Sequence, residues 1–305
     1  MLVHLTAHSV SGIPLAEWPS ASRLWRWLRR AFPHALAAVL MPNHPHLILD
    51  TPEPERARTT LALILAALGR RDPSPDWSRA APRWEPVPRP EEIPDLKHLR
   101  RLVRYLALNP CRDRLVRDPL EWEWSTHRDV VGAITDPWIS AARLAAAFGA
   151  LPVAPAVFAA RWHAYVSGDP HCDVNGTPPP RPVKPTEMPR WPLGRIVAAA
   201  TAATRSLAAA IRGRTLARRL FVQLAWRHGW RHTPTLAQAC GVTVQAVGRL
   251  RAHPDAELVA AGDMCLGDDR LLRRRLDARQ RHGLPTGTGG VGGTRQNLSV
   301  MPARP

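Results

Sequence analysis

Two histidines separated by a single residue, His44 and His46, are the side chains of this chain best suited to hold a metal ion. The apolar residues that follow them predict a strand, and residues two apart in a strand point to the same side. Both imidazoles can therefore reach one metal ion, and Asn109 could supply a third ligand. A metal ion held in this way polarises a phosphodiester and stabilises the charge that develops on it. On spacing alone, two surface histidines on a strand are the commoner outcome.

A tyrosine lies one helical turn before Asn109. Residues 96–112 carry apolar side chains at helical spacing, which predicts a helix with one buried face that Pro110 is expected to end. A tyrosine beside a metal ion can attack phosphorus and form a covalent intermediate with DNA. Tyr165 is the only other tyrosine of the chain. A solvated polar face is the alternative interpretation. The apolar face is Leu96, Leu99, Leu102, Val103 and Leu106, and the polar face is His98, Arg101, Tyr105 and Asn109.

The composition favours a partner with many negative charges. The 305 residues include 42 Lys and Arg against 25 Asp and Glu, which gives a formal net charge of +17. Clustered basic side chains bind closely spaced phosphates through counterion release, so nucleic acid ranks before a membrane surface. The hydrophobic content of 45% is enough for packed cores.

The cysteine spacing and the hydropathy of the sequence indicate the cellular compartment. The four cysteines are widely spaced, and without a C-x-x-C pair they indicate neither a zinc site nor a disulfide framework. The sequence has no apolar run of membrane-spanning length, and its first residues lack the apolar core of a signal peptide. We therefore expect a cytoplasmic protein that handles DNA or RNA.

Two separate motifs resemble one known family. Residues 40–49, Leu-Met-Pro-Asn-His-Pro-His-Leu-Ile-Leu, resemble the His-hydrophobic-His (HUH) strand of the single-tyrosine transposases, in particular the REP-associated tyrosine transposases. Residues 104–112, followed by 115–119 and 124–128, resemble the tyrosine helix of that family and the segment after it. The resemblance covers about half of the chain, roughly residues 1–165, and both motifs occur in the family's order.

The resemblance implies a fold, an activity and a set of site residues. The fold is α+β, a small ferredoxin-like antiparallel sheet with helices on one face. Tyr105 is then the nucleophile that forms a 5′-phosphotyrosine on single-stranded or hairpin DNA and frees a 3′-hydroxyl. His44 and His46 bind a divalent ion, and Asn109 falls where the family places its third polar ligand. By ligand preference the ion is Mn²⁺ or Mg²⁺.

Two departures from the family pattern affect the expected activity more than the fold. Pro45 replaces an ordinary apolar residue, and proline lacks the donor of a strand ladder, so it suits an edge strand or a strand end. Residues 72–95 are a Pro-rich loop around Trp77 and Trp84 where the family has a helix and a Gly/Arg-rich segment. The alternative function is therefore a domesticated, catalytically silent protein that binds repeat DNA.

Residues 233–251 carry a second pattern, which predicts a helix-turn-helix. Thr233 is expected to cap the first helix and Gly241 to take the left-handed conformation of a tight turn. Thr243 would cap the second helix, and Val247 would anchor it in the core. The residues left exposed for phosphates or base edges are Gln245, Arg249 and Arg251.

The surroundings of this pattern are basic. With the helix at 217–225, it resembles the DnaA-type helix-turn-helix appended to some members of the transposase family, and an ordinary helical hairpin is the alternative. The helix at 268–281, with Arg270 and residues 273–275, is expected to add basic surface. The candidates for DNA contact are Arg101, Arg112, Thr243, Gln245, Arg249 and Arg251.

The chain divides at changes in composition. We expect strands at 1–10, 35–40 and 44–50, helices at 20–30, 56–70, 136–150 and 156–168, and a closing strand or tight turn around Trp122 and Trp124. Glu121 and Glu123 are expected to be solvated. Monomer and homodimer are both compatible with the sequence. The predicted divisions are an HUH domain at 1–135, accessory helices at 136–168, a Pro-rich linker at 169–192, a helical DNA-binding domain at 193–283 and a disordered tail at 284–305.

Overall fold

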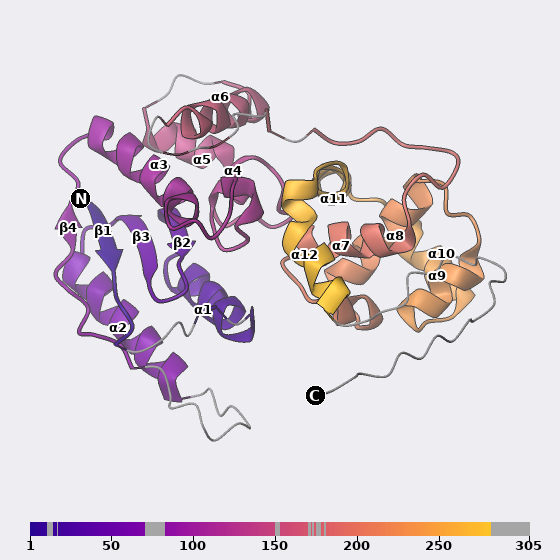
Figure 1. Ribbon diagram of the computed structural model, residues 1–305, viewed down its shortest axis with the longest axis horizontal. Helices are drawn as coiled ribbons and strands as arrows, with labels where there is room; N and C mark the ends of the chain where they lie inside the picture. Colours follow the sequence, from indigo (N-terminus) through magenta and orange to yellow (C-terminus); the bar gives the residue numbers. More distant parts are fainter. Residues whose placement is uncertain are drawn as a thin grey trace, which may run out of the picture.

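A computed structural model describes residues 1–10, 15–16, 18–70, 83–149, 153–169, 172, 174, 178–179 and 181–281. The expected tail at 284–305 and residues 72–82 of the expected Pro-rich loop, with Trp77, lie outside these residues. The described chain forms an α+β half with a small sheet and, beside it, a half made only of helices (Figure 1). No helix among the described residues has the length and apolar character needed to cross a membrane.

Four antiparallel strands form one sheet in the order β2-β3-β1-β4, which confirms the expected antiparallel sheet. The elements of this half follow one another as βαββαβ, the arrangement of ferredoxin-like folds. The bounds are β1 Leu2–Thr6, α1 Trp18–Ala31, β2 Ala35–Leu40, β3 Pro45–Asp50, α2 Pro54–Arg70 and β4 Glu91–Glu92.

The register of the strands decides which side chains share a face. In β1, Val3 and Leu5 are buried, whereas His4 and Thr6 alternate with them and point to the opposite face. Thr6 pairs with His46 of the central strand β3, so His4 and His46 lie on one face. Pro45 is the first residue of β3 and pairs with the last residue of β2, which confirms the strand-end position expected for a proline.

Helices lie on both faces of the sheet. Helix α1 packs against α2, and α3 (Leu96–Arg112) packs against β2 on the other side of the sheet (Figure 1). Asn109 of α3 reaches the His46 face. The expectation of helices on one face therefore holds for α1 and α2 and is wrong for α3. In α1 Trp25 is buried, whereas Trp27 is only partly buried.

Helix α3 follows the predicted periodicity except at its ends. The Asp95 side chain caps it by accepting the backbone N–H of His98 at 2.6 Å. Leu99, Val103 and Leu106 are buried, whereas Leu96, predicted to be buried, is 45% exposed in the first turn. Pro110 does not end the helix. It removes one donor in the last turn, and the Asp113 N–H still donates to the Asn109 carbonyl at 3.1 Å.

The segment after α3 turns back along the sheet without forming a strand. It contains the 3-10 helix η1 (Pro119–Glu121) and α4 (His127–Val130). Between them residues 123–124 form a turn and an isolated bridge joins Val39 to Ser125, so the expected tight turn is present and the expected closing strand is not. Trp122 and Trp124, two residues apart, are both buried. The first accessory helix is shorter than expected, and the second matches. Their bounds are α5 Ala141–Ala147 and α6 Pro155–Ser167.

The second half is helical, as expected, and has its own cluster of buried residues. This cluster also includes Leu120, Val131 and Ala133 from the segment after α3, so the two halves share part of a core. The predicted domain boundaries stay predictions. The elements are α7 Leu193–Ala203, η2 Ala208–Arg212, α8 Leu216–Arg227, α9 Thr233–Cys240, α10 Val244–Arg251, α11 Ala256–Gly267 and α12 Asp269–Arg281.

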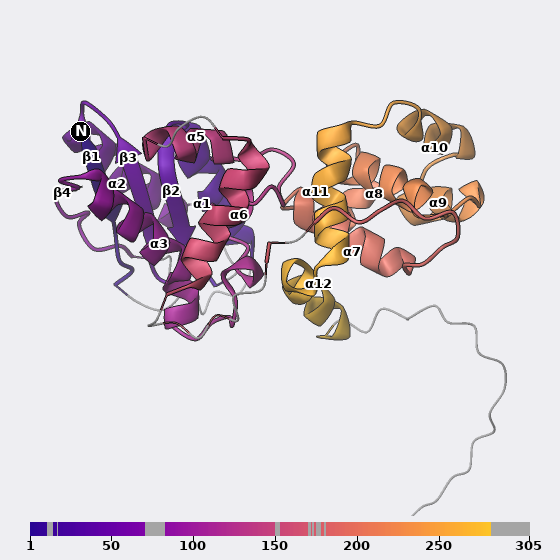
Figure 2. The same ribbon diagram turned by 90° about the horizontal axis from the view of Figure 1, so that it is seen from above.

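Four buried carboxylates of residues 118–129 form ion pairs with arginines of the helical half. Glu121 and Glu123 are 7% and 2% exposed, so the expectation that they are solvated is wrong. Arg270, Arg273 and Arg275 of α12 are paired with carboxylates of the first half. Figure 2 shows α12 on the side of the helical half that faces the sheet half. The pairs are Asp118–Arg270, Glu121–Arg273, Glu123–Arg275 and Asp129–Arg205.

Replacing Glu123 by Gln should destabilise the protein in a pH-dependent way. Burial raises the pKa of Glu123, but Arg275 and three neighbouring arginines outweigh it, so the pKa in the folded state is lowered. A lowered folded pKa contributes stability above the unfolded value of about 4.3, and this contribution is lost as the pH falls through the folded pKa. At pH 7 we expect Glu123→Gln to lose about 3 kcal/mol in urea unfolding, because the Arg275 side chain, only 12% exposed, is left without its carboxylate partner.

The difference between wild type and Glu123→Gln should narrow as the pH falls below about 4. Glu92→Gln, which changes an exposed glutamate on β4, is the matched control and should unfold like wild type. An equal loss of stability at pH 7 and pH 3 would show that packing, not the charge of Glu123, is responsible.

Candidate active site

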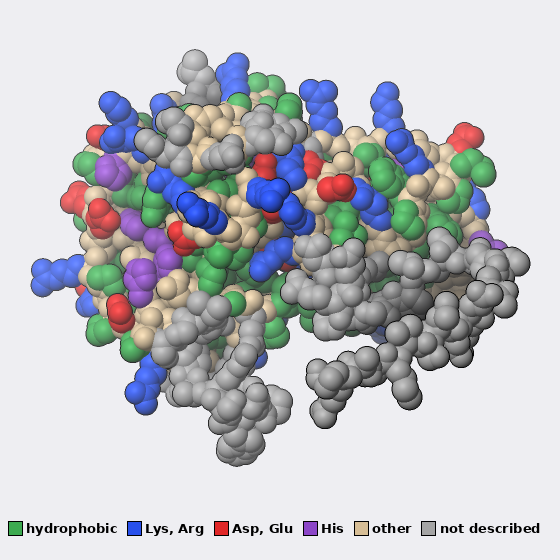
Figure 3. Space-filling view, in the orientation of Figure 1, with side chains coloured by type: hydrophobic (Ala, Val, Ile, Leu, Met, Phe, Trp, Pro, Cys, Tyr) green, Lys and Arg blue, Asp and Glu red, His purple; other side chains and the backbone are tan. Residues whose placement is uncertain are grey.

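The two sequence-predicted histidines and Asn109 come together on the open face of the sheet. His46 is 7% exposed, and its ring meets the His44 ring edge-on with centroids 4.6 Å apart. Histidine side chains gather over this part of the molecule (Figure 3). The strand β3 supplies His46 and the turn before it supplies His44, so the predicted pairing of the two imidazoles is present in the geometry.

Both ring nitrogens of His46 have partners. Its Nδ1 lies 3.0 Å from Nε2 of His4, and its Nε2 lies 3.0 Å from the side-chain nitrogen of Asn109. An amide N–H can only donate, so Nε2 of His46 accepts and the proton of a neutral ring is on Nδ1, where it is donated to His4. This chain of hydrogen bonds joins three elements, β1, β3 and α3.

His4 is the site residue that the sequence analysis missed. Its Nδ1 lies 3.4 Å from a carboxylate oxygen of Glu91, which β4 brings opposite it in the sheet register. The neutral tautomers form one consistent chain, in which His4 donates to Glu91 and His46 donates to His4. Alternation in residues 1–10 predicted a strand but gave no reason to single out His4, because its partners are 42 and 87 residues away.

His44 is oriented by its neighbour. Its Nδ1 lies 2.7 Å from the side-chain oxygen of Asn43 and therefore donates to it, which leaves Nε2 as the acceptor. The ring of His8 stacks on His44 with centroids 4.5 Å apart. His44 and His46 thus both have their Nδ1 proton committed to an oriented acceptor.

Burial keeps the imidazoles of His44 and His46 neutral at physiological pH. Burial is the main cause that lowers the pKa of His46 to about 2, and the nearby His44, His4 and His8 add to it. Burial, together with His8, lowers the pKa of His44 to about 4, and burial also lowers that of His4. A neutral imidazole keeps the lone pair that a metal ion needs.

Tyr105 borders this cluster at the surface. Its side chain is 37% exposed, and its ring stands edge-on to His46 with centroids 6.4 Å apart. The Arg112 guanidinium lies 5.0 Å from the centroid of the Tyr105 ring and is paired with Asp169 at 3.3 Å. Tyr165 on α6 is similarly exposed, at 39%, but its ring lies under the guanidinium of Arg104 from α3.

His44, His46 and Asn109 fit a divalent metal ion if the side-chain amide of Asn109 is flipped. Within the described residues no group of three His, Cys, Asp or Glu side chains could hold a metal ion, so a third ligand must be another residue type. Asn109 can be that ligand, since a flip of its amide turns its oxygen toward His46. Imidazoles whose Nδ1 proton is held by an oxygen or nitrogen acceptor present Nε2 to a metal, which is the usual arrangement of histidine ligands.

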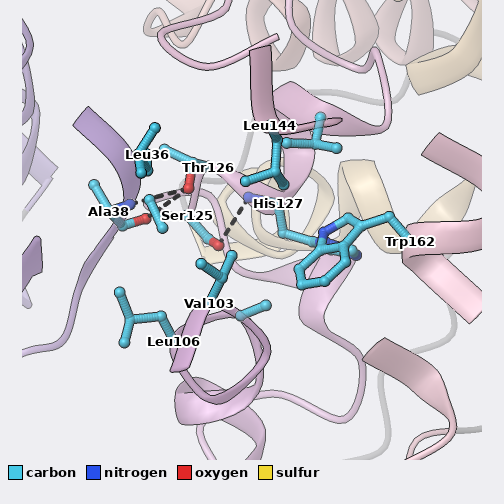
Figure 4. Close-up of a pocket in the computed structure, with 12 residues that line it drawn as sticks. Leu36, Ala38, Val103, Leu106, Ser125, Thr126, His127, Leu144 and Trp162 are labelled. Carbon is cyan, nitrogen blue, oxygen red and sulfur yellow. Dashed lines mark hydrogen bonds between the residues drawn. The ribbon is translucent and has the colours of Figure 1, made fainter. Parts of the chain in front are cut away.

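A second histidine pair lies in the core and belongs to no open site. His127 Nε2 is 3.0 Å from Nδ1 of His163, and His127 borders a cavity of about 10 Å³. Figure 4 shows this cavity between β2, α3 and the segment at Ser125–His127. That volume is about the minimum for one water molecule, so a substrate does not fit.

The helix-turn-helix has the predicted turn. Gly241 follows α9 with φ +63°, the left-handed conformation, and Thr243 caps α10 by accepting the N–H of Ala246. Val247 is fully buried, as predicted. The cap of α9 is His232 and not Thr233, because Thr233 is already the first helical residue.

The structure does not bring the helix-turn-helix to the histidine site. Helices α9 and α10 lie at the end of the molecule away from the sheet (Figures 1 and 2). Gln245 and Arg249 are exposed, whereas the Arg251 guanidinium stacks on the Trp226 ring 4.0 Å from its centroid. Arg101 is exposed on α3, one turn before Tyr105.

Comparisons with known proteins do not place the chain in a family. No family model matches it, and no curated protein matches it. Among solved structures, a REP-associated tyrosine transposase bound to a REP hairpin is similar over 43% of this chain and 79% of that chain, with 22% identity and a TM-score of 0.33. A likeness at this TM-score shows neither the fold nor the activity of this chain.

We expect the His46 ring at pH 7 to be neutral with its proton on Nδ1, because it donates to His4 and accepts from Asn109. Nitrogen-15 NMR of the two ring nitrogens measures this directly. His4→Phe removes the acceptor and should shift His46 toward a mixture of tautomers, whereas His34→Ala, a change at an exposed histidine, should not. A proton found on Nε2 of wild-type His46 would contradict the assignment and would mean that Asn109 presents its oxygen.

Proposed function

We propose that this chain is a metal-dependent DNA strand transferase in which Tyr105 is the nucleophile. The observation that carries the proposal is the convergence of His46, Asn109 and a half-exposed Tyr105 at one place on the sheet. These residues come from the two motifs whose sequences resemble the REP-associated tyrosine transposases.

The proposed reaction uses the chain's own groups as follows. The Tyr105 oxygen attacks a DNA phosphorus and forms a 5′-phosphotyrosine, while the bond from phosphorus to the 3′-oxygen breaks and that oxygen takes up a proton. His44, His46 and Asn109 would hold a divalent ion, which supplies charge stabilisation at the phosphate when bound. Arg112, over the Tyr105 ring, is placed to pair with the phosphate that approaches it.

The helix-turn-helix would contribute to the choice of DNA site. Gln245 and Arg249 project from the exposed face of α10, the position from which such a helix contacts base edges. Thr243 accepts the Ala246 N–H as a cap, and its hydroxyl proton can still be donated to a phosphate oxygen. Arg251 would have to leave Trp226 to reach DNA, and Arg101 would contact DNA beside Tyr105.

A DNA-binding protein without cleavage is the second candidate. One observation favours it: both ring nitrogens of His46 are hydrogen-bonded within the protein, so a metal ion must displace the Asn109 contact. Covalent attachment and metal binding separate the two candidates.

Incubation of the full chain with labelled hairpin DNA and Mn²⁺ should give a labelled band at the protein's mass on a denaturing gel. Tyr105→Phe should abolish the band and keep DNA binding, because only the attacking oxygen is removed. Tyr165→Phe is the matched control, since it changes the only other tyrosine, which has a similar exposure, and it should keep the band.

A band that persists in Tyr105→Phe and disappears in Tyr165→Phe would assign the nucleophile to α6 and refute the proposed site. Tight hairpin binding without any covalent band in wild type would support the non-cleaving candidate instead.

Mn²⁺ binding should depend on the histidines. In isothermal titration we expect His46→Ala to weaken the Mn²⁺ affinity at least about tenfold, because a ligand is lost. His34→Ala removes an exposed histidine outside the cluster and should leave the affinity unchanged. Equal affinities of wild type and His46→Ala would exclude this metal site.

A further inference from the structure

Arginines surround a groove that begins beside Tyr105. The groove has a volume of about 830 Å³ and lies between the turn that follows α3 and the start of α12. Lys and Arg side chains gather where the two halves of the molecule meet (Figure 3). The charged residues that line this arginine groove are Arg112, Arg114, Arg117, Arg270 and Arg273, with Asp118 and Glu121.

The arginine groove is continuous with the candidate active site through Arg112. This residue lines the groove, and its guanidinium lies over the Tyr105 ring at 5.0 Å. A chain of phosphates that starts at Tyr105 therefore meets Arg112 first and can continue along the other arginines.

Two of the groove arginines are fixed by carboxylates. Arg270 pairs with Asp118 at 2.9 Å, and Arg273 pairs with Glu121 at 2.7 Å. The Arg273 side chain is still 49% exposed, so it can contact an anion while it keeps its partner. The helical half thereby contributes positive charge to a groove that begins beside Tyr105 of the sheet half.

The other two arginines have no such partner. The Arg114 and Arg117 side chains are exposed and make no hydrogen bond or ion pair with the described part of the chain. Arg114 also has φ +56°, and among the described residues Arg205 is the only other non-glycine residue with positive φ. Such a conformation costs free energy in a residue other than Gly or Asn, and it tends to persist where function requires it.

The chemistry of the lining favours a phosphate backbone over bases. None of the described residues that line the groove is aromatic, so stacking platforms for bases are not provided there. Five arginines against two carboxylates leave an excess of positive charge, and guanidinium groups pair well with phosphate oxygens.

We propose that the arginine groove binds the phosphate backbone of the single DNA strand that extends from the phosphate at Tyr105. Arg114 and Arg117 are its free phosphate contacts, and Arg270 and Arg273 form a fixed wall. The proposal rests on the proposed function for its direction, since Tyr105 marks where the strand starts.

The test measures binding of the full chain in EDTA, so that no cleavage occurs. Fluorescence anisotropy compares a hairpin without an extension to hairpins with single-stranded extensions of increasing length on either side. Affinity should rise with an extension on one side only. Arg114→Asn/Arg117→Gln should abolish this gain and lower the slope of log affinity against log salt by about 1.4, about 0.7 for each lost phosphate contact. Asn tolerates the left-handed conformation, so the variant should fold.

The matched control is Arg30→Ala/Arg56→Ala, which removes the same charge from exposed positions of α1 and α2. It should keep the gain from the extension. An equal loss in both double variants would reduce the effect to net charge and overturn the proposal. So would an unchanged gain in the groove variant, or a preference for ribonucleotide extensions over deoxyribonucleotide ones.

The outcomes for the groove and for the proposed function are separable. Covalent attachment at Tyr105 together with extension binding that ignores Arg114 and Arg117 overturns the groove and leaves the function. Extension binding that depends on these arginines, without a covalent band, supports the groove and removes the strand transfer.

Discussion

The pairing of buried carboxylates with arginines across the two halves is the constraint on which this structure depends most. Asp129 is fully enclosed, and Arg205 reaches it while also donating to the Glu123 and Ser125 carbonyls. A buried charge left without its partner costs several kcal/mol, about 3–5 when one member is removed. The segment at residues 118–129 therefore cannot take its place beside the sheet unless the helical half is also in place.

The same segment supports the candidate site through β2. Its backbone binds the free edge of β2, through the Leu40 N–H to the Trp124 carbonyl and the Thr126 N–H to the Ala38 carbonyl. β2 in turn pairs with β3, which carries His46. Helix α3 supplies Tyr105 and Asn109 from the other direction, so the site lies where a strand fixed by the sheet meets a helix fixed by its apolar face.

Local signals in the sequence were enough for the elements and for the two motifs. Apolar spacing predicted α1, α2 and α3 closely, and Gly241 predicted the turn between α9 and α10 because only a few residues accept a left-handed conformation. The site residues that local signals could not supply are His4 and Glu91. Their role depends on strand register, and nothing in residues 1–10 or 91–92 indicates which residue they will face.

The sequence also did not determine which charged residues pair with each other. Arg273 and Glu121 are 152 positions apart, so no helical or strand spacing relates them. The arginines of α12 looked like a solvated or DNA-facing stripe, and Glu121 and Glu123 looked like surface residues of a turn. Only the packing of two halves assigns these charges to each other, which is why composition could indicate a polyanionic partner without indicating which arginines are free to meet it.

The ion pairs between the halves also fix the distance between α10 and Tyr105. Because these ion pairs join α12 to the segment beside β2, the folded protein sets the separation between α10 and Tyr105, which does not depend on a flexible linker. A nucleic acid held at both places would have to span that separation with its own bends and unpaired nucleotides. The number of nucleotides between the recognised duplex and the attacked phosphate would then be dictated by the protein, and a target with the right bases at the wrong spacing would be rejected.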